Sequence, residues 1–285
     1  MYRAKAKGGG SAQVFSRDMH EQVIAAIQLE KELRRAVKEA QFRVLYQPIF
    51  AADRRTPVGF EALVRWQHPK RGLLEPGAFL GVAEETGLIV EIDRLVWREA
   101  CAQVRLWQQH FGRSLALNLN LSSQQFYHPD LLATLEAIFE ETGIAPDQVN
   151  LELTEGALVD ASPGTTGTLE AFKALGCGLY LDDFGTGYSS LSYLQHFPID
   201  VLKIDRSFVT RLNRDHDSTE LVRTIVAMAR NLKLKVVAEG VEDETQFTKL
   251  RELGCTYTQG FLFAEPLSGE DAAALVARLG RVEIG

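Results

Sequence analysis

Eight short β-rich runs, separated by helical segments, constrain the fold of this chain more than any other feature of its sequence. Amphipathic segments with apolar residues at helical spacing lie between the runs. The eight predicted strands are Phe42–Ile49, Val58–Trp66, Leu115–Leu121, Val149–Thr154, Gly178–Asp183, Val201–Asp205, Leu234–Glu239 and Cys255–Gln259. Regular alternation of strands and helices predicts a parallel sheet, and this number of strands matches a (β/α)8 TIM-type barrel. An open doubly wound sheet gives a similar pattern, and no internal repeat decides between the two.

The segments before the first strand are expected to lie outside the barrel. Residues 1–17 begin with a basic tail followed by Gly8–Ser11, which is typical of a tail and linker. Asp18–Ala40 carries apolar residues at helical spacing and predicts an N-terminal leading helix. The long stretch Pro76–His110 predicts two helices rather than one. The chain is therefore divided into a linker, 1–17, and one domain, 18–285.

Charge and cysteine content exclude several classes of protein. The 31 Lys and Arg residues against 38 Asp and Glu residues give a net charge of −7, so no basic surface indicates DNA or RNA as a partner. Cys101, Cys177 and Cys255 lie far apart, which argues against both a disulfide scaffold and a structural zinc site. No signal peptide or apolar run of about 20 residues is present. We expect a cytoplasmic domain.

Polar side chains stand at or near the ends of seven predicted strands. Because parallel strands place their carboxyl ends on one face of a barrel, we expect these side chains to converge there. They are Glu61, Asn120, Glu152, Asp182, Asp183, Lys203, Glu239 and Gln259. A single carboxylate at a strand end is more often solvated or paired with a cation, but seven such strands together predict a functional site.

The predicted cluster has the composition of a divalent-metal site. Five carboxylates repel one another unless cations neutralise them, and Lys203 with two divalent ions balances their charge. Oxygen ligands suit Mg²⁺ or Mn²⁺, and a pair of such ions can stabilise an in-line phosphoryl displacement. Taken alone, Lys203 is as readily a structural counter-ion as a catalytic group.

The sequence Glu61-Ala62-Leu63 resembles the signature of the EAL-domain cyclic di-GMP phosphodiesterases. Three residues alone mean little, but further matches to that family run in order over about residues 40–270. They are Tyr46–Ile49, Gly59–Trp66, Ala83–Gly87, Asn120–Ser122, Glu152–Glu155, Asp182–Leu191, Val201–Phe208, Ala238–Glu242 and Gln259–Phe261.

The resemblance implies a two-metal phosphodiesterase that hydrolyses cyclic di-GMP to linear 5′-pGpG. It implies a role in catalysis for Glu61, Lys203 and Glu239, and substrate contacts for Gln47, Leu63, Arg65 and Gln259. Glu155 resembles a glutamate that steadies the loop from Phe184 to Ser190, which implies a homodimer. The implied ligands of two Mg²⁺ or Mn²⁺ ions are Glu61, Asn120, Glu152, Asp182, Asp183 and Glu239.

The N-terminal tail Met1–Lys5 resembles the end of a GGDEF diguanylate-cyclase domain, which implies upstream GGDEF or sensor domains in a longer protein. Glu265 stands where the family usually carries a basic residue. Two other readings of the chain remain open. One is a receptor of the same family that binds cyclic di-GMP without cutting it, although such members usually lack acidic residues or the lysine retained here. The other is an unrelated barrel hydrolase such as a glycosidase. That interpretation gives Asn120, the paired aspartates Asp182 and Asp183, and Lys203 no common function.

Overall fold

A computed structural model gives the structure of the protein and describes residues 17–158, 163–185, 194, 196–212 and 216–279. The predicted tail before residue 17, with its GGDEF resemblance, lies outside these ranges. So does the part of the predicted loop that covers residues 186–190. Within the described part of the chain, no helix is both long enough and apolar enough to span a membrane.

The strands form a closed barrel. The sheet runs in the order β1-β9-β8-β7-β6-β5-β4-β2, and β1 pairs with β2 to close it. Closure confirms the TIM-type barrel and excludes the open sheet. All eight predicted runs are strands, with the bounds β1 Phe42–Ala51, β2 Thr56–His68, β4 Ala116–Asn120, β5 Val149–Thr154, β6 Gly178–Phe184, β7 Val201–Ile204, β8 Lys235–Ala238 and β9 Tyr257–Thr258.

One strand of the barrel departs from the parallel arrangement that strand and helix alternation predicts. β1 is antiparallel to both of its neighbours, β2 and β9, whereas the other neighbouring barrel strands are parallel. The four residues 52–55 that join β1 to β2 form a turn. A parallel pair needs a crossover of a dozen or more residues, so this connection permits only a hairpin.

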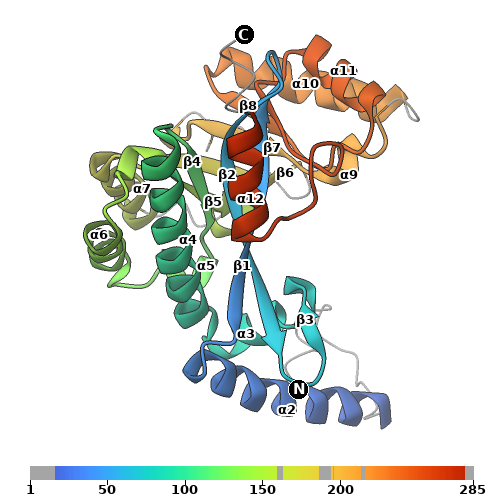
Figure 1. The fold of residues 1–285 in the computed structure, drawn as a ribbon. Coiled ribbons are helices and arrows are strands. Elements are labelled where there is room, and N and C mark those ends of the chain that lie inside the picture. Colours follow the sequence, from blue (N-terminus) through green and yellow to red (C-terminus); the bar gives the residue numbers. More distant parts are fainter. Residues whose placement is uncertain (1–16, 159–162, 186–193, 195, 213–215, 280–285) are drawn as a thin grey trace.

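The strands β1 and β2 continue beyond the barrel as a two-stranded arm (Figure 1). β2 pairs with β4 only as far as Ala62, and its later residues pair with β1 and with the short strand β3 (Gly72–Leu74). The predicted leading helix is confirmed as α2 (Arg17–Lys38), which lies at the far end of this arm (Figure 1) and buries Leu33 and Ala36. Glu61 therefore stands where β2 leaves the barrel.

Helices surround the barrel between its strands (Figure 1). The stretch Pro76–His110 contains two α-helices, as predicted, because Gly87 ends the first of them with a left-handed φ of 76°. The α-helices after α2 are α3 Leu80–Thr86, α4 Ile89–Phe111, α5 Ser123–Phe126, α6 Leu131–Thr142, α7 Pro163–Leu175, α9 Arg206–Val209, α10 His216–Asn231, α11 Glu244–Leu253 and α12 Gly269–Leu279. Short 3₁₀ turns are η1 Pro76–Ala78, η2 Pro146–Gln148 and η3 Glu155–Leu158.

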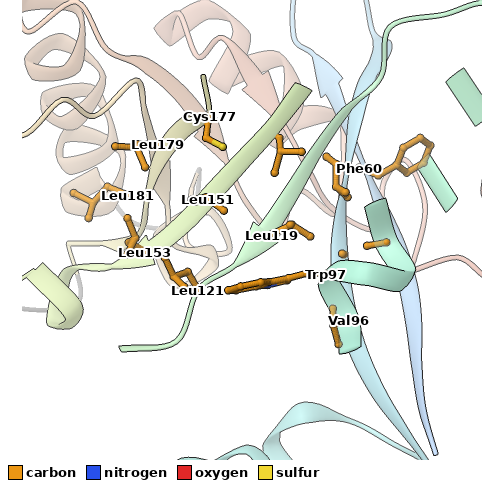
Figure 2. Close-up of a cluster of buried hydrophobic side chains, with 14 of the residues drawn as sticks. Phe60, Val96, Trp97, Leu119, Leu121, Leu151, Leu153, Cys177, Leu179 and Leu181 are labelled. Carbon is orange, nitrogen blue, oxygen red and sulfur yellow. The ribbon is translucent and has the colours of Figure 1, made fainter. Parts of the chain in front are cut away.

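The alternation of side chains along each strand separates an apolar core from a polar interior. Figure 2 shows Leu119 of β4 and Leu151 of β5 in a buried apolar cluster, with Trp97 of α4 close to Leu121. Successive strand residues point to opposite faces, so Asn120 and Glu152, each one residue further along, point to the other face of the sheet. The helices cover the apolar face, and the polar residues are gathered inside the barrel.

Candidate active site

The ammonium group of Lys203 is the centre of an acidic cluster inside the barrel. Lys203 lies within β7, and its side chain is 1% exposed. Its Nζ atom lies 2.6 Å from Glu239 Oε1, 2.7 Å from Glu152 Oε2, and 3.3 Å from both Glu61 Oε2 and Asp182 Oδ1. Four carboxylates from β2, β5, β6 and the end of β8 therefore share one cation.

Two amides hold the carboxylate of Glu61 from either side. Asn120 Nδ2 donates to Glu61 Oε1 at 2.9 Å, and Gln259 Nε2 donates to Glu61 Oε2 at 2.8 Å. Gln259 Nε2 also donates to Gln47 Oε1 at 3.0 Å, whereas Gln259 Oε1 is buried with no hydrogen-bond partner among the described residues. The structure thus brings Gln47, Asn120 and Gln259 together around Glu61. The convergence of Asn120 and Gln259 on Glu61 is the part that the sequence predicts.

Two buried asparagines below the cluster are absent from the sequence-based set. Asn118 Nδ2 donates to Glu152 Oε1, and Asn150 Nδ2 donates to Asn118 Oδ1, each at 2.7 Å. Both precede a predicted site residue by two positions, Asn118 before Asn120 and Asn150 before Glu152. That spacing of two along a strand was the signal for a second interior layer. Its hydrogen bonds fix the orientation of the Glu152 carboxylate.

One ammonium does not neutralise four carboxylates, and the pKa values of Glu61, Glu152 and Glu239 shift in different directions. Burial acts to raise the pKa of Glu61, but Lys203 and the two amides outweigh it and lower that pKa. Burial and then Glu61 raise the pKa of Glu152 well above its usual range, and burial raises the pKa of Glu239 to about 8 against the attraction of Lys203. Burial lowers the pKa of Lys203, but the surrounding carboxylates outweigh this effect and raise it well above normal. Lys203 remains charged while the cluster favours uptake of protons or cations.

One oxygen of each of the four carboxylates is directed at Lys203. Among the residues that the structure describes, no three Asp, Glu, His or Cys side chains are arranged to hold a metal ion. The donor set itself, carboxylates with one amide, is the set that Mg²⁺ and Mn²⁺ prefer. Binding of an ion here requires some carboxylates to turn away from the ammonium.

A cavity of about 230 Å³ opens beside the cluster. Of the predicted substrate-binding residues, Gln47, Leu63 and Gln259 line it. Arg65 does not line it. Its side chain is largely buried and donates to the carbonyl of Val64 at 2.8 Å. The sequence-based set omitted several residues that do line the cavity, namely Arg206, Gly240, Glu242, Gly260 and Phe261.

Asp183 and Glu155 lie near the cluster without contacting Lys203. Asp183 has a φ of 54°, a left-handed conformation that is uncommon outside glycine, and burial followed by the charge of Asp182 raises its pKa. Glu155 Oε1 accepts a hydrogen bond from the backbone N–H of Gly185 at 2.9 Å. This contact reaches the first part of the predicted loop, and the role of Glu155 in dimerisation stays a prediction.

Comparison with known proteins identifies the domain. The EAL domain family model matches residues 30–266. The bifunctional diguanylate cyclase/cyclic di-GMP phosphodiesterase MucR of Pseudomonas aeruginosa is 42% identical over 277 residues, covering 97% of this chain and 40% of MucR. The cyclic di-GMP phosphodiesterase PdeR of Escherichia coli is 39% identical over 267 residues, covering 94% of this chain and 40% of PdeR. The chain thus spans about two fifths of each relative's length.

Solved structures agree with the sequence comparison. The PaMucR phosphodiesterase in complex with c-di-GMP has a TM-score of 0.83 and 43% identity, covering 86% of this chain and 99% of that one. The EAL domain of Mycobacterium smegmatis DcpA has a TM-score of 0.70 and 34% identity, covering 83% of this chain and 96% of that one. The chain belongs to the EAL domain family.

Proposed function

We propose that this domain hydrolyses one phosphodiester bond of cyclic di-GMP, giving linear 5′-pGpG, with two Mg²⁺ or Mn²⁺ ions. The observation that carries the proposal is the convergence of four carboxylates on Lys203 beside an open cavity. The names of MucR and PdeR, and the cyclic di-GMP in the MucR phosphodiesterase complex, support this substrate.

The chemistry of the cluster suits divalent ions. Raised pKa values at Glu152 and Glu239 mean that the buried carboxylates lack sufficient positive charge around them. The residues that would hold the ions are Glu61, Asn120, Glu152, Asp182, Asp183 and Glu239. Bound ions supply the activation of a water molecule and neutralise charge on the phosphoryl oxygens.

Lys203 acts as a donor and not as a base in this proposal. Its carboxylate neighbours raise the pKa of its ammonium group, so Nζ keeps its proton and donates hydrogen bonds to the attacking water and to the carboxylates. Glu239, which lines the cavity, is proposed to take the proton of that water. The water oxygen bonds to phosphorus, the P–O3′ bond breaks, and the departing 3′ oxygen takes up a proton from solvent.

The rest of the cavity binds and orients the nucleotide. Gln47, Leu63 and Gln259 offer amide and apolar contacts at its wall. Glu61 is held by amides on both sides. Arg65 stands two residues after Leu63 on the same face of β2 and is proposed to contact a phosphate where the arm meets the cavity.

We extend the proposal to the protein of which this domain is a part. MucR is bifunctional and much longer than this chain, which supports upstream GGDEF or sensor domains. A homodimer, which the resemblance at Glu155 implies, is also part of this proposal. A cytoplasmic location, expected from the cysteine content, is part of this proposal.

Incubation with cyclic di-GMP tests the proposal directly. The purified protein is supplied with Mg²⁺ or Mn²⁺, with and without chelator, and products are separated by chromatography. We expect linear 5′-pGpG only in the presence of metal. Binding of cyclic di-GMP without product under every metal condition would favour the receptor reading. Absence of both binding and hydrolysis would refute the proposal.

A further inference from the structure

The cavity beside the cluster is strongly acidic apart from one side chain. Glu61, Asp182, Glu239 and Glu242 line it, and among the described lining residues Arg206 is the one cation. Lys203 lies behind this wall and is almost wholly buried. An anionic ligand that enters the cavity therefore meets Arg206 as the first positive charge.

The guanidinium group of Arg206 is not used by the part of the fold that the structure describes. It makes no hydrogen bond or ion pair with any residue in the described ranges, and the side chain is exposed. Four carboxylates line the same cavity, yet none of them pairs with it. By contrast, Lys203 is surrounded by carboxylates, and Arg65 donates to a backbone carbonyl. Arg206 thus keeps its full donor capacity for a ligand.

The backbone around Arg206 holds this side chain at the rim of the cavity. Arg206 is the first residue of α9, and the side chain of Asp205 caps this helix by accepting from the backbone N–H of Ser207 at 3.0 Å. Gly240, in the loop after β8, has a φ of 67°, and a Cβ atom on it would lie 2.5 Å from Cβ of Arg206. Absence of a side chain at Gly240 lets the Arg206 stem pack against the loop that carries Glu239 and Glu242.

Charge balance shows what Arg206 adds. In the proposed site, two divalent ions and Lys203 offset the five predicted carboxylate ligands, which leaves Glu242 and a substrate with two phosphodiester charges uncompensated. A guanidinium group matches phosphate with two parallel donors and keeps its charge at every working pH. We infer that Arg206 is a substrate-binding residue that donates to a phosphodiester oxygen of the cyclic dinucleotide at the cavity rim. This inference rests on the proposed function.

Steady-state kinetics of Arg206→Ala and Arg206→Lys, with Mn²⁺ and cyclic di-GMP, test the inference. We expect Arg206→Ala to raise KM about tenfold with kcat within about twofold of wild type, because the contact is made equally in the bound and reacting states. Arg206→Lys keeps the positive charge but lacks the two parallel guanidinium donors. Its KM should lie between those of wild type and Arg206→Ala. The matched control is Arg211→Ala, which removes an exposed arginine five positions along that does not line the cavity.

Two further measurements separate a ligand contact from a structural role. The dependence of KM on salt should weaken in Arg206→Ala and not in Arg211→Ala, because one phosphate contact is lost. Calorimetric binding of cyclic di-GMP in chelator should weaken by a similar factor even if no hydrolysis is seen. Unchanged thermal unfolding is expected because the side chain has no protein partner among the described residues.

The outcomes are distinguishable from failure of the proposed function. Hydrolysis by wild type with unchanged KM and unchanged salt dependence in Arg206→Ala overturns the inference alone. A lowered kcat with a normal KM in Arg206→Ala also overturns the inference, because Arg206 would then act in the chemical step rather than in substrate binding. Wild-type protein that neither binds nor cleaves cyclic di-GMP overturns both proposals together. If the wild-type protein binds cyclic di-GMP without cleaving it, and Arg206→Ala binds it more weakly, the proposed hydrolysis is overturned. The inference that Arg206 binds the ligand is then supported.

Discussion

Lys203 Nζ lies 2.7 Å from Glu152 Oε2, and both side chains are almost completely buried. A buried pair of this kind is costly to break because the remaining charge has no water to solvate it. Here the remaining charge would be four carboxylates rather than one. The interaction therefore links the stability of the barrel to its proposed chemistry, and both can be measured on the same variants.

Substitution Lys203→Ala should lower the free energy of unfolding by about 3 kcal/mol in chelator, since it leaves the carboxylates without their shared cation. Added Mn²⁺ should recover much of this loss if metal ions occupy the vacated space. Hydrolysis should fall by at least about 100-fold, with KM affected less. Urea unfolding with and without Mn²⁺ measures the change in stability, and steady-state kinetics measure the change in hydrolysis. A variant of normal stability in chelator would contradict the account of the buried cluster.

Substitution Glu61→Ala should reduce hydrolysis by at least about 100-fold, because it removes a carboxylate expected to ligate metal. The affinity for cyclic di-GMP, measured by calorimetry, should change far less because the other residues that line the cavity remain. Glu85→Ala is the matched control, since Glu85 is exposed on α3 and does not line the cavity. Near-normal turnover in Glu61→Ala would remove Glu61 from the proposed metal site.

The sequence predicts much of this fold because each barrel strand has an apolar outward face and a bounded length. It also predicts Glu61, Glu152, Asp182, Lys203 and Glu239 as neighbours, since polar residues at corresponding strand ends must converge in a barrel. The direction of β1 was missed although its signal was present: the turn at residues 52–55 is too short for a crossover helix. The alternation of apolar and polar residues along a strand indicates which face is buried but does not indicate the direction of the strand.

Residues outside the strand ends were harder to predict. Arg206 is an exposed arginine after a strand, a common type of position, and only its place at the cavity rim distinguishes it. Asn118 is polar within an apolar strand, and its function as a donor to Glu152 depends on the register between β4 and β5. Register and loop packing are three-dimensional properties that residue types alone do not specify.

Substitution Gly240→Ala tests the contact that places Arg206. An alanine at a φ of 67° is strained, and its Cβ would lie 2.5 Å from Cβ of Arg206. We expect a loss of about 1–3 kcal/mol in the free energy of unfolding and a raised KM. Gly81→Ala is the control, because no atom lies within 4 Å of the added Cβ and Gly81 is helical. Equal stability of the two variants would contradict the close packing at Gly240.

Asp93 gives a pH dependence that does not involve the acidic cluster. Ser122 Oγ donates to Asp93 Oδ2 at 2.6 Å, and burial raises the pKa of Asp93 to about 7 against the hydrogen bonds from Ser122. The unfolded pKa is about 3.9, so the folded state binds more protons between about pH 4 and 7. The contribution of Asp93 to stability is therefore fully present below about pH 4 and is lost as the pH rises through about 7.

Substitution Asp93→Asn removes this charge and keeps an acceptor for Ser122. Relative to wild type, its free energy of unfolding should rise by on the order of 3 kcal/mol between about pH 4 and pH 8. Urea unfolding in chelator at several pH values measures the difference. Asp147→Asn, at an exposed aspartate, is the control. A difference between Asp93→Asn and wild type that stays constant with pH would show that Asp93 does not titrate in this range.

The most direct test of the central claim is anomalous diffraction from a crystal of this protein soaked in Mn²⁺. We expect two peaks among Glu61, Asn120, Glu152, Asp182, Asp183 and Glu239, with several carboxylates turned away from Lys203 toward the ions. No anomalous peak in the barrel, with all four carboxylates still directed at Lys203, would contradict the claim.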